Sequence, residues 1–303
     1  MKAVVLHEYG GPENLLYEDV PDPQFGDNEV LVQVRATSIN PIDWKLRSGA
    51  AKARMPLDLP AILGRDLSGE VVDHGRNVTG FSKGMRVMAL TNRTYAQLTV
   101  ANADLLAPIP DALSFEQAAA LPLVTITGSQ LIERAVKPIR GQTVLVTGAL
   151  GSVGRTAVYV ARQHGSRVFA GVRAAEREKA QQELHADQVI AIDDEDEIAK
   201  LSELDSIADT VGGATIQKLM KTIRAGGVLG SVLGVPDGAN NYKIRVEAFM
   251  AAPDATRLHQ LADDVARGEF TIPIARTMKL AQIQQAQTIA EKGSAGGKII
   301  LVP

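Results

Sequence analysis

A strand–turn–helix–strand unit in the middle of the chain is the feature that most constrains its fold. Residues 143–146 are apolar and mostly β-branched, as in a buried parallel strand, and Gly148, Gly151 and Gly154 follow at intervals of three. A helical pattern then runs to residue 164, and residues 167–172 predict a second strand. Glycines let the backbone approach a pyrophosphate, and the helix N-terminus offers free N–H groups. The unit predicts a dinucleotide-binding site, with a plain glycine-rich turn as the alternative.

The alternation of strands and helices continues beyond this unit. The predicted strands are 143–147, 167–172, 188–192, 206–211 and 227–234, and the helices between them are 152–164, 175–185, 195–203 and 214–224. Such alternation implies right-handed crossovers between parallel strands. The predicted fold class is α/β, with a doubly wound Rossmann sheet that carries helices on both faces.

Residues 1–110 have a different pattern, in which short strands alternate with turns. The predicted strands are 2–7, 29–36, 84–90 and 95–100, residues 60–72 are predicted to form a turn and a strand, and a short helix is predicted near 41–49. This spacing is typical of a small barrel-like domain. Beyond it the predicted elements are helices 114–121 and 125–136, helix 253–267, strand 271–274, helix 280–291 and strand 297–302.

The composition excludes several classes of function. A net charge of −3 and a pI near 6.0 give no electrostatic reason to expect a nucleic-acid partner. No apolar run approaches the roughly 18 residues of a membrane span, so no membrane partner is expected. The chain contains no cysteine and its five histidines are scattered, so no metal site is expected. A cytoplasmic enzyme that acts on a small molecule is the default expectation.

Short motifs in register along nearly the whole chain resemble one known superfamily. They lie at residues 40–43, 64–71, 84–87, 119–122 with Thr127, 148–154, 209–213 and 297–298. They resemble the medium-chain dehydrogenase/reductase superfamily, and within it the zinc-free quinone oxidoreductase (zeta-crystallin-like) branch. The resemblance implies a GroES-like β-rich catalytic domain at 1–115, completed by 260–303, and a Rossmann dinucleotide-binding domain at 116–259. It also implies a homodimer, in which strands 227–234 and 240–246 could pair edge to edge.

The resemblance further implies a reaction without a metal. Where zinc alcohol dehydrogenases place their ligands, this chain has Asn40, Arg65 with Asp66, and Leu123. Without a Lewis acid an alkoxide is difficult to stabilise at neutral pH, whereas reducing an activated double bond needs only hydride delivery and an oxyanion donor. The expected activity is hydride transfer to an electrophilic small molecule, either a quinone or an α,β-unsaturated carbonyl.

One position indicates which nicotinamide cofactor is used. NAD enzymes carry an acidic residue about 20 positions beyond the glycine turn, where it binds the ribose 2′-hydroxyl. Counting 19 residues from Gly154 leads to Arg173, whose guanidinium can bind a 2′-phosphate, and Arg177 could share this task. NADPH is therefore the predicted cofactor, with solvated arginines as the alternative. The expected cofactor-binding residues are Gly148, Ala149, Gly151, Ser152, Val153, Gly154, Arg173, Arg177, Val211, Gly212, Leu233, Gly234 and Lys298.

Asn40, Asp43 and Thr127 are the catalytic candidates that the resemblance provides. Asn40 and Asp43 are expected beside the nicotinamide, where they would position the substrate and donate hydrogen bonds; an Asx turn before Pro41 is the alternative. Thr127 matches a threonine near the cofactor, and the alternative is a helix-interior threonine bonded to its own backbone.

Neighbouring residues are assigned structural roles. Arg65 and Asp66 are expected to form an ion pair under the site, with catalysis as the alternative. Trp44, where many relatives have tyrosine, is expected to form an apolar wall. Lys45 and Tyr95 are expected to be surface or packing residues rather than proton donors.

Three other functions compete with this one. A short-chain dehydrogenase needs a lysine four residues after a tyrosine, and none of the five tyrosines has one, which argues against that class. A non-enzymatic NADPH-binding protein, crystallin-like or redox-sensing, stays open because no residue is an unambiguous acid or base. An enoyl thioester reductase also stays open, although no extended basic patch is present to hold coenzyme A phosphates.

Overall fold

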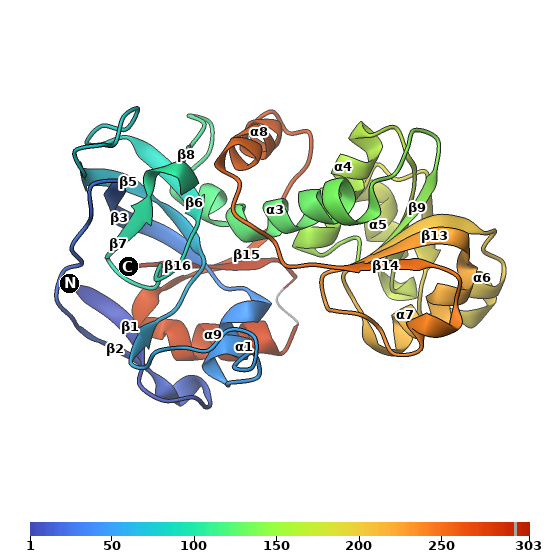
Figure 1. Ribbon diagram of the computed structural model, residues 1–303, viewed down its shortest axis with the longest axis horizontal. Coiled ribbons are helices and arrows are strands. Elements are labelled where there is room, and N and C mark those ends of the chain that lie inside the picture. The colour runs from blue at the N-terminus through green and yellow to red at the C-terminus, as the bar shows by residue number, and fades with distance from the viewer. Residues whose placement is uncertain (294–295) are drawn as a thin grey trace. The chain divides into compact units, whose positions relative to one another are not determined.

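The computed structural model describes residues 1–293 and 296–303, which divide into two units (Figure 1). The first unit contains Met1–Leu123 and Pro253–Pro303, and the second contains Val124–Ala252. The domain boundaries at residues 115 and 260 separate a catalytic from a cofactor-binding domain, and they stay predictions. None of the described helices is both long and apolar enough to cross a membrane.

The second unit is built on a six-stranded sheet in which all neighbouring strands are parallel. The strand order is β11 (Gln188–Ala191), β10 (Arg167–Val172), β9 (Thr143–Thr147), β12 (Leu204–Asp209), β13 (Ile223–Ser231) and β14 (Arg245–Ala248). The helices are α4 (Ser152–Gln163), α5 (Arg177–Glu183), α6 (Glu195–Ala199) and α7 (Gly213–Leu219). Because the chain winds outward from β9 on one side and from β12 on the other, the sheet is doubly wound, which confirms the predicted α/β Rossmann class.

Strand β9 lies inside this sheet because its side chains are apolar on both faces. Val144, Leu145 and Val146 are completely buried, as expected for a parallel strand covered on both sides. Its carboxyl end lies beside that of β12, where the strand order reverses. Open α/β sheets bind ligands outside the carboxyl ends of the strands at such a switch point.

The first unit contains a seven-stranded sheet and a three-stranded sheet. The larger follows the path β15 (Ile274–Lys279), β16 (Lys298–Val302), β3 (Glu29–Ser38), β5 (Asp66–His74), β6 (Arg86–Leu90) and β8 (Ala107–Pro108), and β7 (Leu98–Asn102) pairs with β3. The smaller has the order β2 (Leu15–Asp19), β1 (Lys2–Leu6) and β4 (Ala61–Ile62). The helices are α1 (Pro41–Arg47), α2 (Phe115–Ala119), α8 (Ala255–Ala266) and α9 (Ile283–Glu291), while α3 (Pro122–Gln130) spans the change from the first unit to the second.

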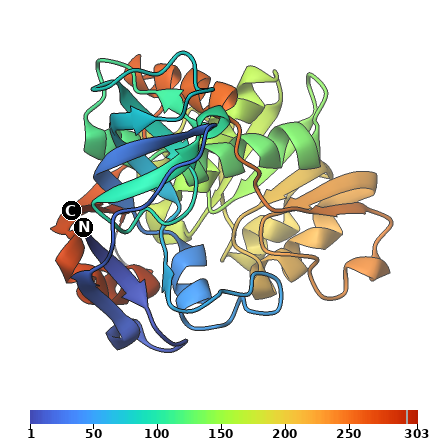
Figure 2. The same cartoon turned by 60° about the vertical axis from the view of Figure 1, so that its left-hand side comes forward.

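Strand β16 joins the C-terminal segment to the N-terminal part of the first unit. It pairs antiparallel with β3, so that Ile300 lies opposite Ser38 and Leu301 lies opposite Thr37. On its other side it pairs with β15 in parallel. The two ends of the chain consequently lie on the same side of this unit (Figures 1 and 2). The C-terminal strand is an integral part of the β-rich unit.

Some elements of the structure were not predicted, and some predicted elements have the wrong bounds. Strand β2 is absent from the predictions, because only one of its five residues is buried and its sequence ends in two acidic residues. The strand predicted at 271–274 is instead β15, whose side chains are all at least partly exposed. The helix predicted at 214–224 ends at Leu219, and β13 begins at Ile223. The strand predicted at 227–234 corresponds to β13, but β13 does not lie at the sheet edge, because it pairs with β12 on one side and β14 on the other.

Replacing Gly154 with alanine should destabilise the second unit. A Cβ atom at this position would lie 2.2 Å from the carbonyl oxygen of Gly148 and 2.8 Å from Cα of Ala149, so the backbone would have to move. We expect Gly154→Ala to lower the free energy of unfolding by about 1–3 kcal/mol in chemical denaturation. Gly151→Ala is the matched control, because its Cβ would lie 3.1 Å from the nearest atom. Equal losses in the two variants would contradict this account.

Candidate functional site

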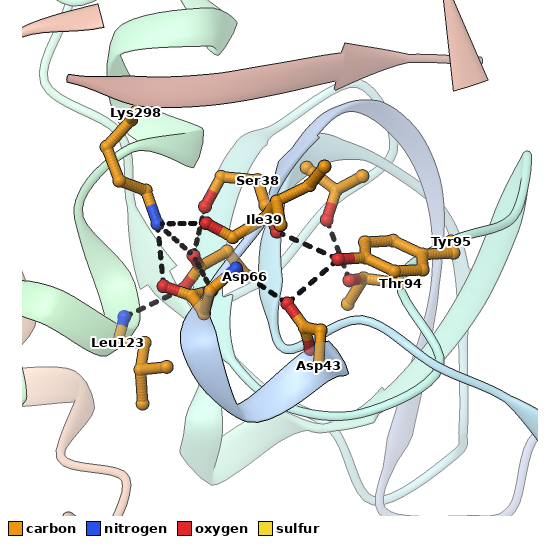
Figure 3. A network of polar contacts seen from close by, with 10 residues as sticks. Ser38, Ile39, Asp43, Asp66, Thr94, Tyr95, Leu123 and Lys298 are labelled. Atoms are coloured by element: carbon orange, nitrogen blue, oxygen red, sulfur yellow. Dashed lines mark hydrogen bonds and ion pairs between the residues drawn. The ribbon is translucent and has the colours of Figure 1, made fainter. Parts of the chain in front are cut away.

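A buried polar network in the first unit surrounds the carboxylate of Asp66 (Figure 3). Oδ2 of Asp66 accepts hydrogen bonds from the Ser38 hydroxyl and, at 2.7 Å, from Nδ2 of Asn40. Oδ1 accepts a hydrogen bond from the backbone N–H of Leu123 at 2.7 Å. The Lys298 ammonium lies 3.4 Å from Oδ2 and donates a hydrogen bond to Oδ1 of Asn40 at 2.6 Å. Both oxygens of this carboxylate are therefore satisfied, and its charge faces a cation.

Three strands bring the network together. Strand β3 ends at Ser38, β5 begins at Asp66 and β16 begins at Lys298, and β5 and β16 both pair with β3. Asn40 follows β3 and is the N-cap of α1. Pro41 begins the helix, at a position where the backbone N–H has no partner within the helix. The network therefore depends on the pairing of strands that are far apart in the sequence.

Asp43 is a second buried carboxyl group in the same region. Its Oδ2 accepts hydrogen bonds from the backbone N–H of Asn40 and from the Tyr95 hydroxyl, each at 2.8 Å. Its Oδ1 is buried and has no hydrogen-bond partner among the described residues. Burial raises the pKa of Asp43 to about 7, because the two hydrogen bonds and the Lys298 charge offset only part of the lost solvation. Near neutral pH this carboxyl group is thus partly protonated.

Burial also sets the charge of the other titratable side chains around Asp43. It raises the pKa of Tyr95 well above its ordinary value, and the nearby Asp43 raises it further. It lowers the pKa of Lys298, while Asp66 and Asp43 act in the opposite direction. Tyr95 is completely buried and keeps its proton, so it acts as a hydrogen-bond donor to Asp43 rather than as ordinary packing.

The ion pair expected between Arg65 and Asp66 is wrong. Asp66 pairs with Lys298 instead. Consecutive residues of an extended chain point to opposite sides, so Arg65 does not follow Asp66 into the network. Trp44 is half-buried and packs against an apolar cluster, and Lys45 is exposed. In the described part of the chain, no group of three or more histidine, cysteine or acidic side chains is placed to hold a metal ion.

The glycine turn lies in the second unit between β9 and α4. Gly148 follows β9 with a φ of +63°, a left-handed conformation that glycine adopts without strain. Gly151 is the N-cap of α4, and Ser152, Val153 and Gly154 form the first turn of the helix. No Cβ atom fits at Gly154 without moving the backbone of the turn. The turn thus presents bare backbone and a helix N-terminus at one place, which suits a pyrophosphate.

A cavity of about 180 Å³ lies at the carboxyl ends of β12 and β13 in the second unit. Its lining includes Gly212, Leu233 and Gly234, which are among the predicted cofactor-binding residues. Val211 and Leu233 are 44% and 46% exposed, which is unusual for apolar side chains in this chain. Exposed apolar groups beside a cavity are typical of a ligand site.

Asp209 ties three neighbouring strand ends together beside this cavity. Its Oδ1 accepts hydrogen bonds from the Thr147 hydroxyl at 2.9 Å and from the backbone N–H of Gly212 at 3.0 Å. Its Oδ2 accepts one from the Ser231 hydroxyl at 3.0 Å. No role is predicted for Asp209 from the sequence. Its position at the end of an apolar strand, shortly before two glycines, was the signal that could have indicated one.

Arg173 and Arg177 are both paired with carboxylates on the surface of the second unit. Arg173 follows β10, its side chain is 71% exposed, and it donates to Glu176 through Nε at 3.0 Å and Nη2 at 2.9 Å. Arg177 donates to Glu197. Since exposed ion pairs contribute little stability, a phosphate could replace Glu176 at Arg173.

The predicted site residues fall into two groups. Asn40 and Asp43 meet in one network, and Lys298, predicted to reach the cofactor, belongs to that network with 6% exposure. Thr127 lies in α3, in the second unit, which also contains the glycine turn. Ser38, whose hydroxyl contacts Asp66, carries no signal in the sequence.

Two family models match the chain. The alcohol dehydrogenase GroES-like domain matches residues 26–111, and a zinc-binding dehydrogenase model matches residues 184–301. The first match lies within the β-rich unit, and the second runs from the doubly wound unit into the C-terminal segment.

Relatives of known name match all or part of the chain. The quinone oxidoreductase of Pseudomonas aeruginosa is 30% identical over 326 residues, covering 100% of this chain and 99% of that protein. The quinone oxidoreductase of Mus musculus is 36% identical over 182 residues, covering 59% of this chain and only 54% of the mouse protein. Among solved structures, a quinone oxidoreductase from Coxiella burnetii has a TM-score of 0.89 at 28% identity, covering 100% of this chain and 99% of that one. Mycobacterial Rv1454c complexed with NADPH has a TM-score of 0.86 at 27% identity and full coverage of both chains.

Asp43→Asn should remove one source of pH dependence in stability. The pKa of Asp43 rises from 3.8 to about 7 on folding, so the folded state binds this proton more tightly than the unfolded state. Its contribution to stability is complete below about pH 4 and is lost as the pH rises through 7. Asparagine imitates the protonated form, so wild type should lose up to about 4 kcal/mol more than Asp43→Asn across this range in urea denaturation.

The control for this experiment is Asp111→Asn, which changes an exposed carboxylate of the same unit. Its stability should follow the wild-type pH dependence. Parallel curves for wild type and Asp43→Asn would contradict the pKa assigned to Asp43.

Proposed function

We propose that this chain, which belongs to the quinone oxidoreductase family of the medium-chain dehydrogenase/reductase superfamily, is an NADPH-dependent reductase that transfers hydride to a quinone or an α,β-unsaturated carbonyl without a metal. The family binds a nicotinamide cofactor. The observation that carries the proposal is the glycine turn at the switch point of the doubly wound sheet, where no Cβ atom fits at Gly154. Arg173 and the NADPH bound by the mycobacterial structure support NADPH over NADH.

The donor set around Asp66 supports chemistry without a metal. Asn40 and Asp66 stand where zinc-dependent relatives place ligands, and both already contact the Lys298 ammonium. Leu123, at the third such position, contributes only its backbone N–H. A metal ion at Asp66 would have to displace Lys298, and among the described residues no group of three or more histidine, cysteine or acidic side chains is placed to hold it, which is a poor arrangement for zinc.

NADPH, when bound, supplies the hydride. The backbone of the glycine turn would hold the pyrophosphate, and Arg173 with Arg177 the 2′-phosphate. Val211, Gly212, Leu233 and Gly234 complete the proposed cofactor site of the second unit, whereas Lys298, which the resemblance assigns to the cofactor, is engaged with Asp66 and Asn40 in the first unit. Asn40 and Asp43 are proposed as positioning residues, and Thr127 remains the proposed catalytic residue. Because Asn40 and Asp43 are completely buried, their role in the proposal is to hold the segment between β3 and α1 in place, and water supplies the proton.

A homodimer through the outer strand of the doubly wound sheet is part of the proposal. Strand β14 pairs with β13 on one side and is the last strand of the described sheet on the other. Two such strands could pair about a two-fold axis, which would cover both edges.

Turnover with a panel of electron acceptors tests the proposed function. We expect the purified chain to oxidise NADPH in the presence of simple quinones and enones, followed by the absorbance of the reduced nicotinamide. Primary alcohols with NADP⁺ should give no reaction, and a metal chelator should change no rate. NADPH binding without turnover of any acceptor would favour the non-enzymatic alternative, and a loss of rate with chelator would refute metal independence.

Arg173→Glu should reverse the preference between the two nicotinamide cofactors. A carboxylate at this position would repel the 2′-phosphate, and the charge-assisted bonds to the guanidinium would be lost. The dissociation constant of NADPH should therefore increase by roughly tenfold to hundredfold. The dissociation constant for NADH should change little. Glu176→Gln is the complementary variant, because it frees the Arg173 guanidinium and should tighten NADPH binding. An unchanged ratio of the two constants, measured by calorimetry, would refute the role of Arg173.

A further inference from the structure

We propose that a second cavity, within the first unit, binds the electron acceptor and selects acceptors that carry a carboxylate on an apolar body. This cavity has a volume of about 410 Å³, within the usual range of small-molecule sites. The proposal rests on the proposed function in one respect, namely that the bound molecule is the acceptor. The preference for a carboxylate depends only on residues of the cavity.

The cavity adjoins the buried network around Asp66. Leu63 and Arg65 line it, and Asp66 is the next residue of the chain. Leu46 also lines it and lies on α1, three residues after Asp43. The segment that carries Tyr95 forms another part of its surroundings, because the Tyr95 N–H donates a hydrogen bond to the Leu63 carbonyl at 3.0 Å. The cavity and the buried Asp43 are therefore parts of one local structure within the first unit.

Most of the residues that line the cavity carry apolar side chains, and charged side chains share the wall with them. The apolar side chains come from α1 and from the segment that leads into β4 and β5, with Met55 and Leu57 among them. Both of these are only half-buried, although they pack against the apolar cluster of this unit. Such a wall suits the ring system or hydrocarbon part of an acceptor.

Two arginines in the wall form no ion pair, unlike several other arginines of this unit. Arg35, Arg47 and Arg76, in the same unit, all form ion pairs. Arg65 and Arg93 form none within 4.0 Å among the described residues, and Nε of Arg65 is buried with no hydrogen-bond partner there. Arg65 is half-buried and Arg93 is exposed, so both guanidinium groups lie at the cavity without a carboxylate within 4.0 Å among the described residues.

Arg93 is held there by an unusual backbone conformation. Its φ is +62°, which is strained for a residue with a side chain, and it does not end a helix. The loop is anchored on both sides, because Thr91 N–H donates to the Arg65 carbonyl at 2.9 Å and Tyr95 N–H donates to Leu63. Strain that the surrounding structure maintains is typical of ligand sites.

The two guanidinium charges indicate an anionic ligand group. Asp58 also lines the cavity but lies more than 4.0 Å from both guanidinium groups, so the lining keeps a net positive charge. A carboxylate offers two coplanar oxygens that match the guanidinium geometry, and its bonds to arginine gain strength where water is excluded. Apolar side chains together with two arginines that form no ion pair fit an acceptor with a carboxylate at one end.

Three related enones test the proposal. They are benzalacetone, its para-carboxylate, and the methyl ester of that carboxylate, which keeps the size and removes the charge. We expect the carboxylate to bind at least about tenfold more tightly than the ester in calorimetric titrations of the full chain, with or without NADPH. The difference should shrink as salt is added. Equal affinities for the carboxylate and the ester would overturn the proposal.

Variants connect this preference to the cavity. Arg65→Gln and Arg93→Gln should each remove most of the preference for the carboxylate, while the affinity for the ester should change less than about twofold. Arg54→Gln is the matched control, since Arg54 is an exposed arginine of the preceding loop outside the cavity lining. A preference that survives in the double variant, or that Arg54→Gln abolishes equally, would overturn the proposal. Thermal unfolding of each variant verifies that it is folded.

Turnover separates this proposal from the proposed function. Arginine-dependent binding of the carboxylate without reduction of any enone or quinone would refute the reductase and leave the carboxylate site standing. Reduction of benzalacetone and the carboxylate with equal kcat/KM would support the reductase and refute the selective site. Selective reduction of the carboxylate, lost in Arg65→Gln, would support both.

Discussion

The buried carboxylate of Asp66 is the constraint on which the first unit depends. Removing such a charge from water costs several kcal/mol, and the cost is offset only when both oxygens are satisfied and a cation is close. Ser38, Asn40 and the Leu123 N–H supply the hydrogen bonds, and Lys298 supplies the charge. Since Lys298 opens the C-terminal strand, the N-terminal strands can bury Asp66 only when β16 has paired with β3. The ion pair thus links the two ends of the sequence more specifically than apolar contacts would.

Asp43 shows what happens to a second carboxyl group when the available cation is already engaged. Lys298 contacts Asn40 and Asp66, while Asp43 receives only a backbone N–H and the Tyr95 hydroxyl, and one of its oxygens has no partner in the described chain. Repulsion from Asp66 adds to the effect of burial, so the pKa of Asp43 reaches about 7. The neighbourhood therefore contains one carboxylate that is paired with the lysine and one that takes up a proton near neutral pH, and this difference follows from where the lysine lies.

The parts of the fold that follow local sequence patterns were predictable, and the parts that depend on long-range pairing were not. The glycines at 148, 151 and 154 have a local cause, a turn between a strand and a helix, and the doubly wound sheet follows from the alternation after them. The partner of Asp66 is 232 residues away, so nothing near it in the sequence could indicate Lys298. The same reason explains the wrong pairing of Arg65 with Asp66. Arg173 could be found by counting from the glycine turn. Its hydrogen bonds to Glu176 could not be predicted, because they depend on the conformations of the two side chains.

Arg65 and Asp66 together determine how charge is distributed in the first unit. Because adjacent residues of an extended chain face opposite ways, Asp66 enters the network, where Lys298 neutralises it, and Arg65 lines the neighbouring cavity without a carboxylate. The cation inside the network is consequently unavailable to a substrate, whereas the cation beside the cavity has no carboxylate within 4.0 Å among the described residues. Two adjacent residues with opposite charges thus have opposite consequences: one completes the interior of the unit, and the other leaves a positive charge where a ligand can reach it.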